Sequence, residues 1–237
     1  MKAMIFAAGR GERMRPLTDT CPKPLLKVRG RSLIVWHILN LVKAGLTEIV
    51  INHAHLGQLL EAALGDGSQF GATIVYSAEG TALETAGGIA KARHLLGDDP
   101  FVAVAGDIYC PHFDFNQVKD VLEECDPWGK PYAPHERDLA WLYLVKNPAH
   151  HQQGDFALAN FSVTNDGDPR YTFSGIGVYR PELFDNIVPG ETAKLAPILR
   201  EFADQGKIGG EVYRGDWTDV DTVERLEQLN APLKARS

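Results

Sequence analysis

The sequence has few cysteines and no long apolar run. The three cysteines, Cys21, Cys110 and Cys125, form no C-x-x-C pair, and their odd number argues against a framework of disulfides. No stretch approaches the roughly 18 apolar residues that a membrane-spanning helix needs. The apolar stretch after Lys2 ends at Gly9, too early for a signal peptide. We therefore expect a cytoplasmic protein with reduced thiols and no membrane partner.

Positive charge is scarce in the whole chain but concentrated near its start. The 24 Lys and Arg residues are outnumbered by 31 Asp and Glu residues, which gives a net charge of −7. The exception is the segment with the basic residues Arg10, Arg13, Arg15, Lys23, Lys27, Arg29 and Arg31, against the acids Glu12 and Asp19. A short cationic segment in an acidic protein suits a small polyanion, whereas nucleic acid needs basic charge over a broad face. We therefore expect no nucleic-acid partner.

The same segment begins with a turn that suits phosphate. The apolar run at residues 4–7 predicts a buried strand, and Gly9 and Gly11 after it let a backbone turn approach a ligand closely. Backbone N–H groups in such a turn bind phosphate. Two common phosphate loops are excluded, because the dinucleotide fingerprint needs a glycine where Met14 stands and the Gly-Lys-Ser/Thr loop is absent.

From Gly9 to Leu25 the chain reads G-x-G-x-R-M-x-P-L-T-x-x-x-P-K-P-L. This pattern resembles the signature of the sugar-1-phosphate nucleotidyltransferases. The resemblance implies that Arg13 and Lys23 are catalytic and that the substrates are a nucleoside triphosphate and a sugar 1-phosphate. The alternative interpretation is a glycine turn with solvated arginines and prolines that shape a loop.

Periodicity predicts a Rossmann-like α/β fold. Strands expected at 48–52, 72–77 and 101–105 alternate with helices at 32–43, 56–64 and up to about 96, which indicates a mostly parallel sheet with helices on both faces. A helix is expected at 114–124 and a loop at 126–137. Strands expected at 139–145, 156–163 and 171–179 have no helices between them, so we predict a small antiparallel extension over the sugar site. Helices near 181–186 and 195–205, a strand at 208–213 and a helix ending near 229 complete the chain.

We treat residues 1–237 as a single nucleotidyltransferase domain. Residues 1–125 would form the nucleotide-binding half, and 126–237 the sugar-binding half with the second metal ligand. The resemblance places the nucleotide against the signature and against a small-residue loop at 79–89. Its expected contacts are Ala8, Gly9, Gly11, Glu12, Arg13, Lys23, Leu83, Thr85, Gly87, Gly88 and Gly106. For the pair Gly87-Gly88, close packing of a helix on the sheet is the open alternative.

Two aspartates are expected to hold Mg²⁺. Asp107 follows the predicted strand at 101–105, and the carboxyl end of such a strand faces the ligand crevice. The W-x-D-V-x-T pattern at 217–222 resembles the second metal site of the family, with Asp219 in the matching position. One or two carboxylates completed by phosphate oxygens and water suit Mg²⁺. Asp221, with Glu224 three residues later, is expected to cap the last helix, and Asp216 is a weaker candidate ligand.

Other motifs narrow the resemblance. L-E-T-A-G-G-I, N-P-x-H-H-x-x-G-D-F and F-S-G-I-G-V-Y are similar to the branch that joins UTP to N-acetylmuramic acid α-1-phosphate in peptidoglycan recycling. The E-K-P segment that usually contacts the sugar is missing, and the expected sugar contacts are Asp138, Ala140, Asn160 and Ser174. Mannose-1-phosphate guanylyltransferases and an inactive nucleotide-sensing domain remain alternatives. We expect a monomer, and we expect solvated or hydrogen-bonded histidines at His150-His151 rather than a zinc site.

Overall fold

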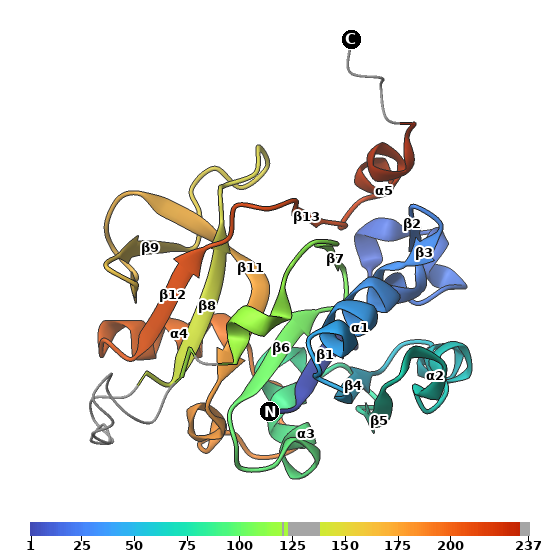
Figure 1. The fold of residues 1–237 in the computed structure, drawn as a ribbon, viewed down its shortest axis with the longest axis horizontal. Helices are drawn as coiled ribbons and strands as arrows, with labels where there is room; N and C mark the ends of the chain where they lie inside the picture. Colours follow the sequence, from blue (N-terminus) through green and yellow to red (C-terminus); the bar gives the residue numbers. More distant parts are fainter. Residues whose placement is uncertain (120, 123–137, 233–237) are drawn as a thin grey trace.

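A single nine-stranded sheet forms the centre of the computed structural model, which describes residues 1–119, 121–122 and 138–232 (Figure 1). In spatial order the strands are β5 (Thr73–Ala78), β4 (Glu48–His53), β1 (Ala3–Ala7), β6 (Phe101–Ala105), β11 (Arg170–Tyr179), β8 (Ala140–Val145), β12 (Ile208–Val212), β10 (Ser162–Thr164) and β9 (Phe156–Ala159). The amino-terminal half supplies the parallel part, because β1 pairs with β4 and β6, and β4 with β5, all in parallel. The predicted α/β class is confirmed.

Helices cover both faces of the parallel part: α1 (Leu33–Lys43) and α2 (Gly57–Leu64) lie on one face and α3 (Glu84–Leu96) on the other. In the second half, α4 (Leu195–Asp204) packs against β10 and β12, and α5 (Val223–Asn230) packs against β2. Successive strand side chains point to opposite faces, so Ile5 of β1 packs in one core with α1 and α2. Met4, its neighbour, packs in a second core with α3 and α4. The continuous apolar run of β1 is explained by burial on both sides.

The second half extends the same sheet. β11 runs antiparallel to β6 and to β8, while β12 runs parallel to β8. The predicted strand at 156–163 is in fact two strands, β9 and β10. They are joined by a two-residue turn in which Asn160 and Phe161 both have left-handed backbones, with φ of 50° and 63°. A hairpin turn of this kind favours Asn, a signal that the sequence prediction overlooked.

Two further expectations about helices need correction. The predicted helix at 114–124 is only a 3-10 turn, Phe115–Val118, within the described residues, and the predicted loop at 126–137 lies outside them. The cap of α5 is Thr222, whose hydroxyl accepts a hydrogen bond from the Arg225 N–H at 3.3 Å. The capping role predicted for Asp221 is therefore wrong.

Small strands bring distant parts of the chain together at one edge of the sheet. Beyond β6, β7 (Ile108–Tyr109) pairs with β13 (Thr218–Asp219), which crosses the molecule between β12 and α5 (Figure 1). β2 (Lys27–Val28) and β3 (Arg31–Ser32) form a hairpin that follows the signature. These pairings place the carboxyl ends of β1 and β6 beside the carboxy-terminal segment.

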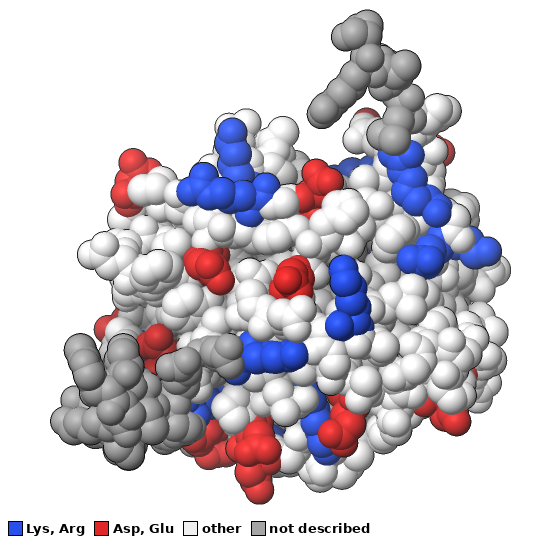
Figure 2. Space-filling model, in the orientation of Figure 1, with Lys and Arg blue, Asp and Glu red and all other residues white. Residues whose placement is uncertain are grey.

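The surface shows neither a membrane span nor a broad basic face in the view drawn. Among the described helices, none combines the length and the apolar character that crossing a membrane requires. On the face seen in Figure 2, Lys and Arg side chains form small groups separated by acidic and uncharged residues. Positive charge on this face is therefore local.

Candidate active site

The signature folds into a compact turn after β1. Gly11 has a left-handed backbone, with φ of 67°, and a Cβ at this position would lie 2.9 Å from the Thr18 methyl group and 3.3 Å from Lys23 Cβ. Only glycine fits this conformation and this space without strain. The Thr18 hydroxyl donates a 2.8 Å hydrogen bond to the Gly11 carbonyl, which closes the turn. Met14 is fully buried against Leu33 and Val220, and so anchors the turn to the carboxy-terminal segment.

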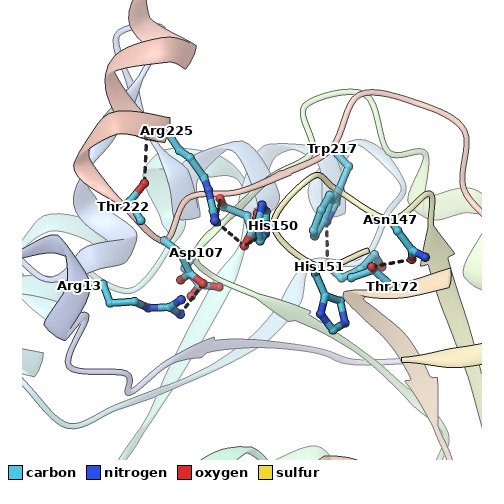
Figure 3. Close-up of polar contacts among 12 residues, drawn as sticks. Arg13, Asp107, Asn147, His150, His151, Thr172, Trp217, Thr222 and Arg225 are labelled. Carbon is cyan, nitrogen blue, oxygen red and sulfur yellow. Dashed lines mark hydrogen bonds and ion pairs between the residues drawn. The ribbon is translucent and has the colours of Figure 1, made fainter. Parts of the chain in front are cut away.

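Two cations of the signature meet on one carboxylate. Lys23 is only 7% exposed, and its ammonium donates to Asp107 Oδ2 at 2.7 Å and to Asp221 Oδ1. Arg13, which is largely exposed, donates to the other oxygen of Asp221 at 2.5 Å. In Figure 3 the Arg13 side chain points toward Asp107. The two predicted catalytic cations therefore reach the same anionic position.

The protonation states of this cluster follow from its contacts. Burial alone would lower the pKa of Lys23, but Asp107 and Asp221 outweigh burial and raise it. Burial would raise the pKa of Asp221, and Lys23, followed by Arg13, holds it below the ordinary value of an aspartate. Lys23 is therefore cationic and Asp221 anionic near neutral pH.

Asp219 lies next to Asp107 through the pairing of β13 with β7. Asp219 is opposite Ile108 in this ladder, and the Val220 N–H donates to the Asp107 carbonyl at 2.9 Å. The Asp219 carboxylate accepts hydrogen bonds from Arg225 at 2.5 Å and from the His150 ring at 3.1 Å (Figure 3). Neither partner was predicted from the sequence.

The three aspartates Asp107, Asp219 and Asp221 line one cavity of about 430 Å³, which we name the carboxylate cavity. Asp107 and Asp219 each keep one oxygen, Oδ1, that accepts no hydrogen bond from the described part of the chain. No cluster of three or more potential metal ligands is assembled among the described residues. Two available hard oxygens fit Mg²⁺, which takes one or two carboxylates and completes its octahedron with phosphate and water.

The signature also borders a second cavity, of about 360 Å³, which we name the signature cavity. Its lining includes the predicted residues Ala8, Gly9, Lys23, Thr85 and Asp107. No atom lies within 4 Å of a Cβ built on Gly9, so this glycine faces open space. The size is within the range of small-molecule sites. Five residues predicted from three separate segments are therefore brought together here.

Other predicted nucleotide contacts have packing roles. A Cβ on Gly88 would lie 2.5 Å from a Glu79 carboxylate oxygen, and one on Gly87 would lie 2.3 Å from the Glu191 carbonyl. Close packing requires glycine at both positions: Gly88 lies against the sheet, the alternative left open by the sequence, and Gly87 lies against the segment before α4, while their contact with a nucleotide stays a prediction. The remaining predicted residues outside the lining of the signature cavity are Gly11, Glu12, Arg13, Leu83 and Gly106.

The predicted sugar contacts are mostly not brought together. Ser174 lines the carboxylate cavity. Ala140 pairs with Tyr179, which pairs with Phe101 at the amino end of β6, so Ala140 and the nearby Asp138 lie at the opposite edge of the sheet from Asp107. Asn160 lies in the exposed β9–β10 turn and lines none of the cavities described here. We keep only Ser174 as a candidate sugar contact.

A third cavity, of about 370 Å³, lies at the start of α4, and we name it the α4 cavity. It shares Phe6, Glu84, Thr85 and Ala105 with the signature cavity, and Asp155, Phe173 and Gly175 with the carboxylate cavity. Lys194 and Arg200 also line it, and the sequence analysis did not single them out. The three cavities are therefore adjoining parts of one site.

Comparison with known proteins identifies the family. The nucleotidyl transferase family model matches residues 2–126. The chain is 51% identical to an N-acetylmuramate alpha-1-phosphate uridylyltransferase from Neisseria meningitidis, covering 98% of this chain and 97% of the relative. A protein of the same name from Caulobacter vibrioides is 31% identical, covering 92% and 90%.

The fold has a counterpart among solved structures. A Bacillus anthracis protein assigned as a glucose-1-phosphate thymidylyltransferase superposes with a TM-score of 0.78 at 22% identity, over 97% of this chain and 94% of that one. At this identity the match bears on the fold alone. The family match and the near full-length relatives, taken together, show that this chain belongs to the nucleotidyl transferase family.

Proposed function

We propose that the enzyme transfers a uridylyl group from UTP to N-acetylmuramic acid α-1-phosphate, giving UDP-N-acetylmuramic acid and pyrophosphate in peptidoglycan recycling. The choice of UTP and of this sugar is supported by the names of the two relatives described above. The observation that carries the chemistry is the convergence of Arg13 and Lys23 on one carboxylate beside Asp107. Two cations that share one anionic position are suited to a phosphate chain.

The reaction is an in-line displacement at phosphorus. An oxygen of the sugar phosphate forms a bond to the α-phosphorus of UTP, and the bond from that phosphorus to the oxygen bridging the β-phosphate breaks. Pyrophosphate leaves with the electron pair. The second pKa of a phosphate monoester is about 6, so the attacking oxygen is already deprotonated near neutral pH. No general base is required.

The chain's own part is to position the phosphates and to stabilise their charge, which is most of what phosphoryl transfer needs from a protein. Lys23, nearly buried and held by Asp107, stabilises charge at the α-phosphate and on the incoming sugar phosphate. Arg13 uses its planar set of donors to hold the departing pyrophosphate. Both cations exchange the Asp221 carboxylate for phosphate oxygens when the nucleotide binds.

Asp107 and Asp219 would hold Mg²⁺ through the oxygens that the described residues leave open. When bound there, the ion would supply positive charge that offsets the repulsion of the two substrate phosphates. Arg225 and His150 orient the Asp219 carboxylate through its other oxygen. Backbone at Ala8 and Gly9, with Thr85, forms the wall against which the nucleotide lies.

A product assay tests the assignment. Purified enzyme with Mg²⁺ is incubated with each of the four nucleoside triphosphates and with the 1-phosphates of N-acetylmuramic acid, N-acetylglucosamine, glucose and mannose, and pyrophosphate release is measured. We expect the highest kcat/KM for UTP with the muramic acid derivative. Activity confined to GTP and mannose 1-phosphate would overturn the substrate assignment and leave the reaction class standing.

A further inference from the structure

The α4 cavity contains positive charge that the protein itself does not neutralise. Lys194 is exposed, lines the cavity and forms no hydrogen bond or ion pair with the described residues. Arg200 lies over the Phe156 ring at 5.0 Å and donates to the Asp155 carbonyl at 3.2 Å and to Asn165 Oδ1 at 3.3 Å. No carboxylate in the described part of the chain lies within ion-pair distance of either cation.

The acidic residues of the cavity, Asp155 and Glu84, do not form ion pairs with its cations. The Asp155 carboxylate accepts from the Phe173 N–H at 2.8 Å and from the His151 ring at 3.1 Å. Glu84, which lines both this cavity and the signature cavity, forms no ion pair with Lys194. The cationic groups therefore remain available to an anion that enters from outside.

The first turn of α4 adds donors of the same sign. Leu195 and Ala196 line the cavity, and the cap residue Lys194 forms no side-chain hydrogen bond to the helix. The first N–H groups of a helix have no partner within the helix, and its amino end carries partial positive charge. Lysine, arginine and helix start thus act together on one small volume.

The rest of the cavity wall is apolar. Phe156, Phe173, Leu195 and Leu199 contribute to it. This wall suits a small hydrocarbon group placed beside the anion. The residues shared with the signature and carboxylate cavities put the α4 cavity next to the site of transfer. A substituent on the sugar ring, rather than the phosphate itself, is the group that it would receive.

We propose that the α4 cavity is a carboxylate subsite that selects sugars carrying an acidic ether substituent, with Lys194 as its main charge and Arg200 beside it. The inference rests on the proposed function, because the D-lactyl ether of N-acetylmuramic acid supplies both the carboxylate and the methyl group. N-acetylglucosamine, which lacks only this ether, offers nothing to the cations. Lys194 is thereby a specificity-determining residue for the sugar.

The test uses two UDP-sugars that differ only in the lactyl ether, the product UDP-N-acetylmuramic acid and its analogue UDP-N-acetylglucosamine. Dissociation constants for both are measured by calorimetry for wild type, Lys194→Met, Lys194→Arg and the control Lys27→Met, which changes an exposed lysine outside the described cavities. KM values for UTP and for the muramic acid phosphate are measured in parallel.

We expect Lys194→Met to weaken UDP-N-acetylmuramic acid about tenfold, the effect of losing one charge-assisted hydrogen bond. The dissociation constant of UDP-N-acetylglucosamine and the KM of UTP should change by less than about twofold, and Lys194→Arg should restore most of the loss. Equal weakening of both ligands, no weakening of either, or equal wild-type affinity for the two would overturn the subsite. Failure of the proposed function gives a different result: the wild-type enzyme would show no turnover of UTP with the muramic acid phosphate. The dissociation constants of the two UDP-sugars can be measured in either case.

Discussion

The carboxylate cavity and the α4 cavity treat positive charge in opposite ways. Each cation that contacts the aspartates of the carboxylate cavity already has an internal anion: Lys23 pairs with Asp107 and Asp221, Arg13 with Asp221, and Arg225 with Asp219. In the α4 cavity Lys194 has no such partner among the described residues. In the first region the positive charge is balanced by the protein before a substrate binds. In the second region the charge of Lys194 is left without an ion pair among the described residues.

The difference teaches how each region contributes to binding. In the balanced region Lys23 and Arg13 must release Asp221 before they bind a phosphate. The net binding free energy of the phosphate is therefore only the difference between the new contact and the contact that is lost. Such a region suits charge that develops during the reaction, where preorganised groups act most strongly. In the α4 cavity a carboxylate displaces only water, so the whole contact acts on ground-state affinity and hence on the choice of sugar.

Removing one member of the paired charges should have the largest effect on turnover. Lys23→Ala and Asp107→Asn should each lower kcat at least about a hundredfold, or roughly 3 kcal/mol, as for losing one preorganised electrostatic contact. Steady-state pyrophosphate release with saturating UTP and sugar phosphate measures the effect. Arg15→Ala is the matched control, because Arg15 is exposed, pairs among the described residues only with Glu12 and Asp19, and lines none of the described cavities. Turnover within about threefold of wild type in either active-site variant would contradict the role given to that residue.

The substitution Gly9→Ala fills space in the signature cavity without changing its charge, and so separates the effect of space from that of charge. Gly9 faces the signature cavity, and an added Cβ meets no atom within 4 Å. Gly9→Ala should raise the KM of UTP about tenfold, because a methyl group obstructs the close approach of phosphate, while Tm stays within about 1 °C. UDP-sugar discrimination at the α4 cavity should be unaffected. A large fall in Tm would show that Gly9 serves the fold instead.

Gly88→Ala is the counterpart of that experiment. Its Cβ would approach Glu79 Oε1 to 2.5 Å and Asn52 Nδ2 to 2.8 Å, inside a buried hydrogen-bonded pair. We expect a loss of about 2 kcal/mol in the free energy of unfolding, a typical value for an overpacked core site. For a chain of this size the melting temperature should fall by roughly 4 to 8 °C. An unchanged melting temperature would contradict the packing role.

The smallest expected effect concerns the internal anion itself. Asp221→Asn removes the charge shared by Arg13 and Lys23, so UTP has less to displace, and its KM should fall about threefold. The ligand-free protein should lose about 1 kcal/mol of stability at most, because part of this network is solvent-exposed. Asp216→Asn is the control, with the same charge change at an exposed position outside the described cavities. A marked rise in KM would instead show that Asp221 contacts the substrate or its metal.

Local patterns predicted much of the fold and of the phosphate-binding end of the site. The periodicity of apolar residues located the strands and helices of the parallel half to within a few residues. Gly9 and Asp107 were found because a strand that ends in small or acidic residues places them at the ligand edge of a parallel sheet, and Lys23 was found through the resemblance of the signature. Such signals lie within a few residues of each other in the chain.

The parts that were missed depend on long-range geometry. Asp221 and Thr222 are adjacent and both residue types cap helices, and Glu224, three residues after Asp221, favoured Asp221 although Thr222 is the cap of α5. The partner of Asp221, Lys23, lies 198 residues away. Asp138 and Ala140 were predicted to contact the sugar, because the sequence of β8 does not show which end of the strand faces the site. Its pairing with β11 puts Val145 at that edge and Ala140 at the other.

The pairing of β13 with β7 has a consequence for the order in which the parts of the site are synthesised. A growing chain that has reached residue 212 contains all nine strands of the main sheet, yet it lacks Asp219 and Asp221. Without those two residues, the signature turn has Asp107 but no acidic partner from the carboxy-terminal segment. The residues that complete the transfer site therefore follow, in the chain, every strand of the main sheet.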